Sequence, residues 1–340
     1  MTHSAHLDPT SLRPLLVANH DHVLGGGEVG LRMLVDGLVE RGHRPTLAVP
    51  GERTLFGRCH EQPVPQALPD MALALRELAG AHDLVHVYSV RAGLGAALAR
   101  TGKPLLLHLL TPDPGDYDAV VAPFADAILC NSRATAERFP DGAARVVHNG
   151  VRAPRRAGSG LGTNPRHRTV GVVGNICARK GQRDVLPALE QVMASRNDVD
   201  VVFAGHATGA IAAELRDRAR AWSGRIRLLG FVPGIADRLG ELDLVLVPSR
   251  SEGFGRVAVE SLCAGVPVLA TRTGGLVEAL AGLHDPWLPD DRGAWPARIL
   301  EELERPTHTP DQLRAAGRRF DPRRHLDQVI SIYRELVSCR

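Results

Sequence analysis

The stretch Leu244–Glu260 reads LVLVPSRSEGFGRVAVE and contains the three parts of an α/β unit in order. Its first four residues form a short apolar run, which is typical of a strand buried on both faces of a sheet. Two glycines follow at Gly253 and Gly255, and a helix is predicted to begin directly after them. A buried strand that leads through a glycine loop into a helix indicates a parallel sheet covered by helices.

Outward from this unit, short apolar runs alternate with helical periodicities along almost the whole chain. In the N-terminal half, the predicted strands are Pro14–Ala18, Thr46–Val49, Leu84–Val87, Leu105–His108, Ala127–Cys130 and Arg145–His148. In the C-terminal half, they are Thr169–Gly174, Val199–Phe203, Ile226–Leu229, Leu244–Val247 and Val266–Ala270. We therefore predict an α/β fold with doubly wound, Rossmann-like parallel sheets.

The stretch 153–168 divides the chain, because it is rich in proline, glycine and arginine and has no apolar period. We predict one Rossmann-like domain over residues 1–152, a linker over 153–168 and a second such domain over 169–320. Residues 321–340 carry a helical apolar stripe. The carboxyl ends of the strands of both domains are expected to face an interdomain cleft, where ligands of open α/β sheets bind.

Composition excludes several classes of protein and of site. A net charge of +3 and an aromatic content of 4% do not fit nucleic-acid binding, for which basic stripes with aromatic platforms are expected. The five cysteines are scattered without a C-x-x-C pair, so we expect reduced thiols and neither disulfides nor a zinc site. We find no signal peptide and no apolar run of about 18 residues, so a cytoplasmic protein is expected. Peripheral membrane contact and the oligomeric state stay open.

The glycine loop has the features of an anion site. Gly253 and Gly255 leave the backbone bare at a predicted helix N-terminus, where free N–H groups and the helix dipole favour negative charge. Glu252 and Glu260 flank this position. The amides could hold a diphosphate while the carboxylates bind the hydroxyls of a sugar and of a ribose. From these residues alone, a solvated glutamate beside a turn glycine explains the pattern equally well.

The region Leu229–Leu280 resembles the C-terminal signature of the retaining glycosyltransferases of family 4. The matching residues are Glu252-Gly253-Phe254-Gly255, Glu260, Ala264–Val268 and Gly274-Gly275, and the two glutamates have the family's E-x7-E spacing. Weaker matches lie at Gly25–Gly27, Asn131-Ser132, Asn149-Gly150 and Lys180-Gly181. The resemblance implies the two-domain GT-B fold, with the last helix crossing back to the N-terminal domain.

The resemblance also implies an activity. It is the transfer of a hexose or N-acetylhexosamine from a nucleotide diphosphate sugar to a small-molecule or glycan acceptor, with retention of configuration. UDP is favoured over GDP as the donor nucleotide. No metal and no cofactor are expected.

The site residues follow from the same resemblance. His108, Lys180 and Glu252 are expected to be catalytic, with His108 and Glu252 at the donor sugar and Lys180 neutralising the departing diphosphate at the start of a helix. The expected donor-binding residues are Gly174, Asn175, Arg179, Lys180, Gly253, Phe254, Gly255, Val257 and Glu260, the last at the ribose. Gly25, Gly26 and Gly27 are expected to form an acceptor or phosphate loop. A surface lysine and a core histidine remain the plain alternatives for Lys180 and His108, and His86 and His148, which also end strands, receive no role.

The sequence departs from the family at Asn175, where members often have an arginine after the glycine that corresponds to Gly174. Arg179 is the candidate to replace that cation. The departure leaves open a non-catalytic protein that binds a nucleotide sugar. A sugar-nucleotide epimerase on the same scaffold also stays open, although the E-x7-E string argues against it.

Other motifs give weaker evidence about function. A nicotinamide dehydrogenase is disfavoured, because the dinucleotide fingerprint is missing. The D-x-D string Asp116–Asp118 lies in a Pro/Gly-rich stretch, and we interpret it as coincidence.

Overall fold

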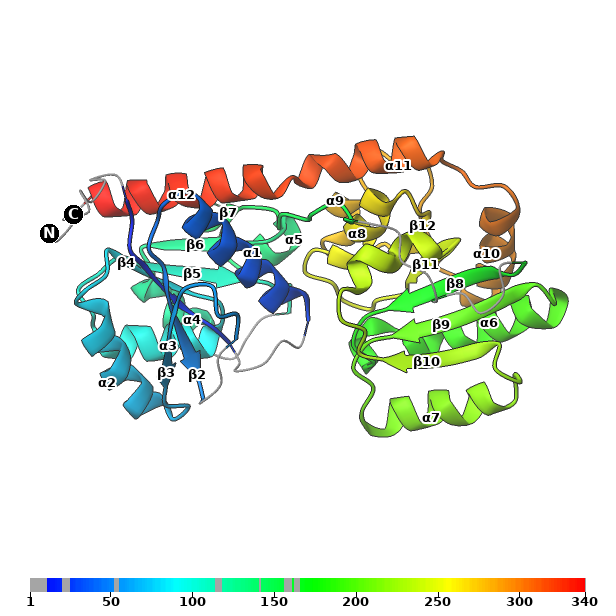
Figure 1. Ribbon diagram of the computed structural model, residues 1–340, viewed down its shortest axis with the longest axis horizontal. Coiled ribbons are helices and arrows are strands. Elements are labelled where there is room, and N and C mark those ends of the chain that lie inside the picture. The colour runs from blue at the N-terminus through cyan, green and yellow to red at the C-terminus, as the bar shows by residue number, and fades with distance from the viewer. Residues whose placement is uncertain are drawn as a thin grey trace, which may run out of the picture. The chain divides into compact units, whose positions relative to one another are not determined.

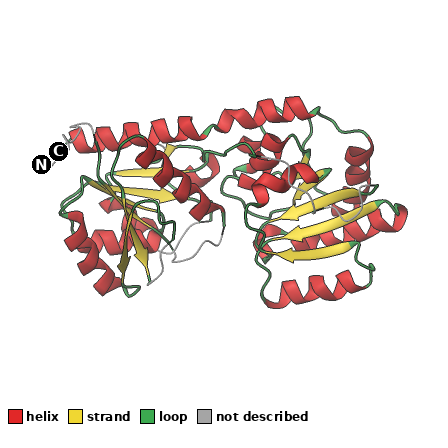
Figure 2. Cartoon of the chain, viewed as in Figure 1, coloured by secondary structure: helices red, strands yellow, loops and turns green. Residues whose placement is uncertain are grey.

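The computed structural model describes residues 11–19, 25–51, 55–113, 118–140, 142–155, 161 and 166–339. The chain divides into two compact units. Unit 1 comprises Met1–Gly150 and Pro322–Arg340, and unit 2 comprises Val151–Asp321. In each unit, a parallel sheet packs against helices (Figures 1 and 2).

Unit 1 is built on a seven-stranded parallel sheet with the order β3-β2-β1-β4-β5-β6-β7. Its strands are β1 (Pro14–Val17), β2 (Thr46–Pro50), β3 (His60–Val64), β4 (Leu84–Val87), β5 (Leu105–Leu109), β6 (Ala127–Cys130) and β7 (Arg145–Val146). Its α-helices are α1 (Gly26–Glu40), α2 (Leu68–Ala79), α3 (Val90–Ala99), α4 (Asp118–Val121), α5 (Arg133–Ala136) and α12 (Pro322–Ser338), and a 3₁₀ turn η1 spans Ala122–Phe124.

Helix α12 belongs to unit 1 although it ends the chain. Its apolar stripe includes Val329, Ile330 and Tyr333, and these side chains join the same hydrophobic core as Leu34 of α1 and Leu84 of β4. Figure 1 shows the helix lying along this unit beside α1. The core of unit 1 is therefore closed by the last helix of the sequence.

Unit 2 has a five-stranded parallel sheet with the order β10-β9-β8-β11-β12. Its strands are β8 (Arg168–Val173), β9 (Val199–Ala204), β10 (Ile226–Gly230), β11 (Leu244–Val247) and β12 (Val268–Ala270). Its α-helices are α6 (Gln182–Ser195), α7 (Gly209–Arg220), α8 (Arg256–Ala264), α9 (Leu276–Ala279), α10 (Trp295–Glu304) and α11 (Pro310–Gly317). Its 3₁₀ turns are η2 (Ala178–Lys180), η3 (Ile235–Glu241), η4 (Arg292–Ala294) and η5 (Arg318–Phe320).

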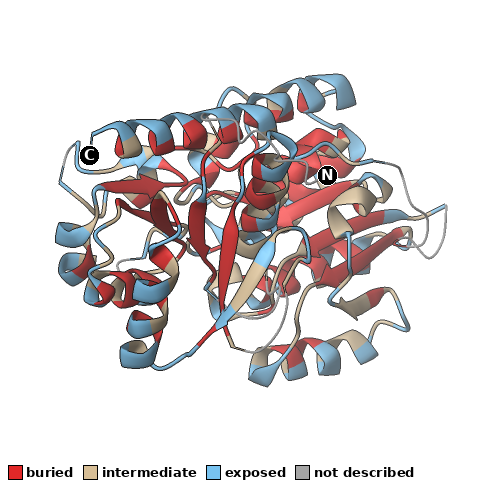
Figure 3. Ribbon diagram, turned by 60° about the vertical axis from the view of Figure 1, so that its left-hand side comes forward, coloured by how far each residue is buried: buried red, intermediate tan, exposed pale blue. Residues whose placement is uncertain are grey.

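The central strands are buried on both faces, as their apolar runs predict (Figure 3). Every strand predicted from the sequence is present within a few residues, which confirms the α/β class. Strand β3 was not predicted, because its sequence HEQPV has no apolar run. It lies at the sheet edge, the place in a sheet that tolerates a proline such as Pro63.

The strand orders define where ligands are expected. In unit 1 the direction of winding reverses between β1 and β4, and in unit 2 it reverses between β8 and β11. Ligands of doubly wound sheets bind at the carboxyl ends of the strands beside such a switch point. Part of the predicted linker, 156–160 and 162–165, lies outside the described residues, and the remainder is grouped with unit 2.

Candidate active site

Two loops of unit 2 bring a lysine and a glutamate together at the switch point. One loop follows β8 and the other follows β11. The Nζ atom of Lys180 lies 2.5 Å from Oε2 of Glu252, and the hydroxyl of Ser249 donates to the same oxygen at 3.0 Å. Both charged side chains are largely buried, so solvent screens their attraction weakly. A cation and a carboxylate are thus held side by side where ligands of this fold class bind.

The loop that carries Lys180 requires a glycine. The sequence predicted Lys180 at the start of a helix. In the structure it ends the turn η2, and α6 begins two residues later. Gly181 separates the turn from the helix with φ of +67°. A Cβ atom on Gly181 would lie 1.8 Å from the carbonyl oxygen of Pro248. Only glycine therefore lets the two loops approach so closely.

Two glycines that follow β12, Gly274 and Gly275, contact the backbone of Glu252 and Gly253. The Gly275 amide donates to the Glu252 carbonyl at 2.9 Å. A Cβ atom on Gly274 would lie 2.1 Å from that same oxygen, and one on Gly275 would lie 2.0 Å from the carbonyl oxygen of Gly253. The Gly274-Gly275 match in the sequence thus has a packing reason.

Helix α8 begins beside Glu252. Its N-cap residue Gly255 has φ of +88° and accepts from the Val259 amide at 3.2 Å. Val257 lies in the first turn of α8, where amides have no partner within the helix and the dipole is positive. The other loop residue, Phe254, is buried and packs edge-to-face on Phe320 of the same unit.

Glu260 projects from α8 and is 8% exposed. Its Oε1 atom accepts from Nη2 of Arg256, one helical turn earlier, at 3.1 Å. Burial raises the pKa of the Glu260 carboxyl, and the neighbouring guanidinium opposes that rise. A buried carboxylate with one cationic partner can accept further donors, such as the hydroxyls of a ribose.

Asn175, at which the sequence departs from the family, lies in the loop after β8, and so does Arg179, the candidate replacement for the missing cation. The carbonyl of Asn175 accepts from Nε2 of Gln182 at 2.9 Å, and Gly174 before it has φ of +142°. Nη1 of Arg179 donates to the Ser251 carbonyl at 3.0 Å. Arg179 therefore lies against the loop that carries Glu252, and its guanidinium has further donors to offer.

In unit 1, His108 of β5 is 1% exposed, and its Nε2 atom has no partner among the described residues. Its Nδ1 atom lies 3.3 Å from Nε2 of His86, which comes from the neighbouring strand β4. Nδ1 of His86 in turn lies 2.6 Å from the hydroxyl of Tyr333 on α12. The rings of both histidines also contact Tyr88.

The glycine loop of unit 1 forms the start of α1. Gly25 is the N-cap, and its amide donates to Oε2 of Glu28 at 3.1 Å. A Cβ atom on Gly27 would lie 3.1 Å from a methyl group of Leu110, which follows β5. The loop therefore lies at the carboxyl edge of the sheet, near the end of the strand that carries His108. Residues 20–24 ahead of it lie outside the described residues.

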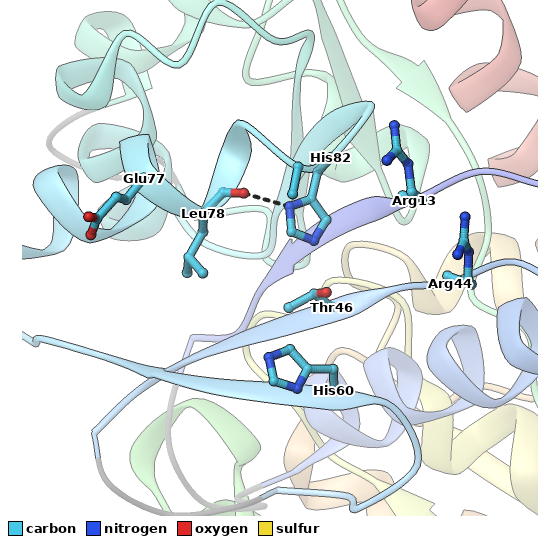
Figure 4. Close-up of a pocket in the computed structure, with 8 residues that line it drawn as sticks. Arg13, Arg44, Thr46, His60, Glu77, Leu78 and His82 are labelled. Atoms are coloured by element: carbon cyan, nitrogen blue, oxygen red, sulfur yellow. Dashed lines mark hydrogen bonds between the residues drawn. The ribbon is translucent and has the colours of Figure 1, made fainter.

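A pocket of about 490 Å³ lies at the opposite, amino-terminal edge of the same sheet (Figure 4). It is lined by Arg13, Arg44, Thr46, His60, Glu77, Leu78, Ala81 and His82. Five of these residues precede or begin strands, so the pocket is remote from the carboxyl edge where His108 lies. Nδ1 of His82 bonds to the Leu78 carbonyl at 2.7 Å.

Over the described ranges, no group of three or more His, Cys, Asp or Glu side chains could hold a metal ion. Asp116 and Tyr117 of the D-x-D string lie outside these ranges, and Asp118 pairs with Arg138. The described helices include none with the length and apolar character needed to cross a membrane.

Two family models match the chain side by side. Residues 24–155 match the model of glycosyltransferase family 4, and residues 167–305 match the model of glycosyl transferases group 1. The chain belongs to the family 4, group 1 glycosyltransferases. Lys180, Glu252 and Glu260 fall within the second match, and His108 falls within the first.

Curated relatives of this glycosyltransferase family member are about a third identical to it over the part of the chain that they match. The D-inositol 3-phosphate glycosyltransferase of Segniliparus rotundus is 33% identical over 197 residues, which cover 51% of this chain and 41% of that protein. The lipopolysaccharide core mannosyltransferase LpsB of Rhizobium meliloti is 32% identical over 170 residues, covering 46% and 48%. The chain thus spans less than half the length of these two relatives.

Solved structures show the fold of this family member. HepE of Anabaena, in complex with UDP and glucose, superposes with a TM-score of 0.79 at 20% identity, over 94% of this chain and 99% of HepE. Sucrose-phosphate synthase of Thermosynechococcus elongatus gives 0.78 at 18% identity, over 97% and 100%. These likenesses confirm the predicted GT-B fold.

Three contacts of the family 4 member were not predicted from its sequence. The Arg256–Glu260 pair has the i, i+4 spacing of helical ion pairs, so that spacing could have predicted it. The contact of His86 with His108 and Tyr333 had no such local signal. It depends on which strands are neighbours and where the last helix packs.

Proposed function

We propose that this protein transfers a sugar from a nucleotide diphosphate sugar to a small-molecule or glycan acceptor, with retention of configuration and without a metal ion. UDP is the favoured donor nucleotide and GDP the second candidate. The sugar is a hexose or an N-acetylhexosamine. Family membership and the complex of HepE with UDP and glucose support this proposal.

The observation that carries the proposal is the Lys180–Glu252 pair beside the start of α8. A lysine at this position can neutralise charge on a departing diphosphate, and the loop and first-turn amides of residues 253–257 can bind the phosphate oxygens. The ammonium group of Lys180 performs the charge neutralisation that other transferases obtain from a divalent metal. Arg179 lies against the same loop and can add a second cation.

The remaining roles are those that the family resemblance implies, and the chemistry of each residue suits its role. Glu252 accepts hydrogen bonds from sugar hydroxyls, Glu260 accepts them from the ribose, and His108 contacts the transferring sugar. The acceptor oxygen attacks the anomeric carbon on the face that the diphosphate leaves, as the bond to the phosphate oxygen breaks. That phosphate oxygen takes the proton of the acceptor hydroxyl, so no enzyme base is required.

The test is transfer in the presence of EDTA. The purified protein is incubated with UDP-glucose or UDP-N-acetylglucosamine and a panel of sugar phosphates, polyol phosphates and oligosaccharides. We expect UDP release that depends on one acceptor, and an α-linked product from the α-linked donor, as measured by the anomeric proton coupling in NMR. A β-linked product would contradict retention. Binding of UDP without turnover of any donor would favour a non-catalytic protein.

A further inference from the structure

The three polar side chains that meet inside unit 1 come from separate elements: His86 from β4, His108 from β5 and Tyr333 from α12. None is more than 1% exposed. The contacts form a chain, with 2.6 Å from Tyr333 Oη to His86 Nδ1 and 3.3 Å from His86 Nε2 to His108 Nδ1. A buried chain of this kind fixes where each proton is held, because each shared contact needs one donor and one acceptor.

Both histidines are neutral, so each ring carries one N–H. Burial lowers the pKa of His108 to about 3 and places the pKa of His86 well below its ordinary value. At neutral pH only two proton arrangements satisfy both contacts. In one, protons point from Tyr333 towards His108, and in the other they point from His108 towards Tyr333.

The Tyr333 contact decides between the two directions. Its 2.6 Å length fits a hydroxyl donor, since N–H···O bonds are about 2.7 to 3.2 Å long. A phenol is also the stronger donor of the two groups, and an imidazole nitrogen is the stronger acceptor. Within the described part of the chain, the Tyr333 hydroxyl has no other acceptor for its proton. Tyr333 therefore donates to His86 Nδ1.

The direction of the other hydrogen bond in this buried row follows from the direction of the Tyr333 bond. His86 holds its proton on Nε2 and donates it to Nδ1 of His108. His108 then holds its own proton on Nε2, the buried atom that has no partner among the described residues. An unmet buried N–H is costly unless a ligand supplies an acceptor.

We propose that Tyr333, acting through His86, fixes His108 as the Nε2–H tautomer, so that His108 presents a hydrogen-bond donor to an oxygen of the bound sugar. Tyr333 and His86 are positioning residues, and the role of His108 rests on the proposed function. The recognised group must accept a hydrogen bond, as a hydroxyl does. A donor sugar that lacks the oxygen to which His108 donates would be a poorer substrate.

The first test is NMR of the unmodified protein labelled with ¹⁵N-histidine. Two-bond ¹H–¹⁵N correlation spectra distinguish the tautomers of a neutral imidazole, and the signal of His108 is assigned by its loss in His108→Gln. We expect a protonated Nε2 and an unprotonated Nδ1 on His108. A proton on Nδ1 of His108 would overturn the proposal.

The second test is the pair Tyr333→Phe and Tyr88→Phe. Each variant removes one buried hydroxyl, but no hydrogen bond joins Tyr88 to either histidine in the structure. In Tyr333→Phe, either proton direction leaves one N–H and one lone pair unmet, so the His108 signal should shift to a mixture of tautomers. In Tyr88→Phe it should stay as in the parent protein. An unchanged tautomer in Tyr333→Phe would overturn the role of Tyr333.

Turnover separates this inference from the proposed function. Tyr333→Phe should lower kcat/KM for the donor sugar roughly tenfold, and should have no further effect in a His108→Ala background. A tenfold loss that persists without His108 would contradict the positioning role. If His108→Ala itself left turnover unchanged, the contact of His108 with the sugar would be overturned, while the NMR result would still report the proton chain.

Discussion

At the residue scale, Lys180 is the cation that we propose binds the donor diphosphate. The chain has only one other lysine, Lys103, which lies before β5 in unit 1 and is a matched control. Lys180→Ala should weaken UDP binding by about tenfold to a hundredfold, because a hydrogen bond to a charged group contributes about 1.5 to 3 kcal/mol. Lys103→Ala should bind UDP as the parent does. Titration calorimetry measures both, and equal affinities in the two variants would remove Lys180 from the site.

At the scale of the elements, two glycines with the same backbone conformation and different surroundings test the close approach of the two loops. Gly181 and Gly234 have φ of +67° and +68°, but a Cβ atom on Gly181 would meet the Pro248 carbonyl, whereas nothing lies within 4 Å of one on Gly234. Gly234→Ala should cost about 1 kcal/mol of unfolding free energy and leave UDP binding intact. Gly181→Ala should cost more and weaken UDP binding, because it separates the loops of Lys180 and Glu252. Chemical denaturation and calorimetry decide, and matching effects would argue against the close approach.

Helix α6 is tied to its surroundings through Asp184 in its first turn. Arg250 binds this carboxylate through two hydrogen bonds of 2.7 Å, Arg292 adds one of 3.0 Å, and the hydrogen bond from Arg250 is the main cause of the lowered pKa of Asp184. A carboxyl whose pKa falls on folding adds stability above its unfolded pKa of about 3.9. That stability is lost as the pH falls through the lower folded pKa.

Asp184→Asn should therefore lower the unfolding free energy by about 1 kcal/mol at pH 7, and the deficit should vanish in acid. Asp311→Asn is the control, since its side chain is 95% exposed beside Arg314 and such pairs contribute little. Urea unfolding at a series of pH values gives both curves. A deficit that does not depend on pH would exclude the ionic tie.

At the scale of the whole molecule, unit 1 depends on a helix that is distant in sequence. Val329 of α12 is fully buried in its core, and Gln328 beside it is exposed. Val329→Asp should increase hydrogen exchange in α1 and β4 of unit 1, because it buries a charge without a partner, and should leave α6 of unit 2 protected. Gln328→Asp adds the same charge on the outer face and should change neither. Increased exchange confined to unit 2 would contradict the division of the chain.

The sequence predicts most of this architecture, for reasons that differ between elements. The run Leu244–Val247 has the same bounds in the prediction and in the structure, because four consecutive apolar residues need a site buried on both faces. Strand β3 escaped because its polar residues lie at a sheet edge. At the candidate site, the glycines and Glu252 have local signals in their loop. The contact of His86 with Tyr333 joins positions 247 residues apart, so no local pattern could have predicted it.

Calorimetric titration of the purified chain with UDP and then GDP, in buffer that contains EDTA, tests most directly whether unit 2 binds the donor nucleotide without a metal. We expect micromolar binding of UDP, about −8 kcal/mol, and much weaker binding of GDP. We expect the Lys180–Glu252 pair and the start of α8 to supply this affinity without a metal. If neither nucleotide binds, the cation missing at Asn175 is not replaced, and unit 2 does not hold a nucleotide sugar in the way proposed.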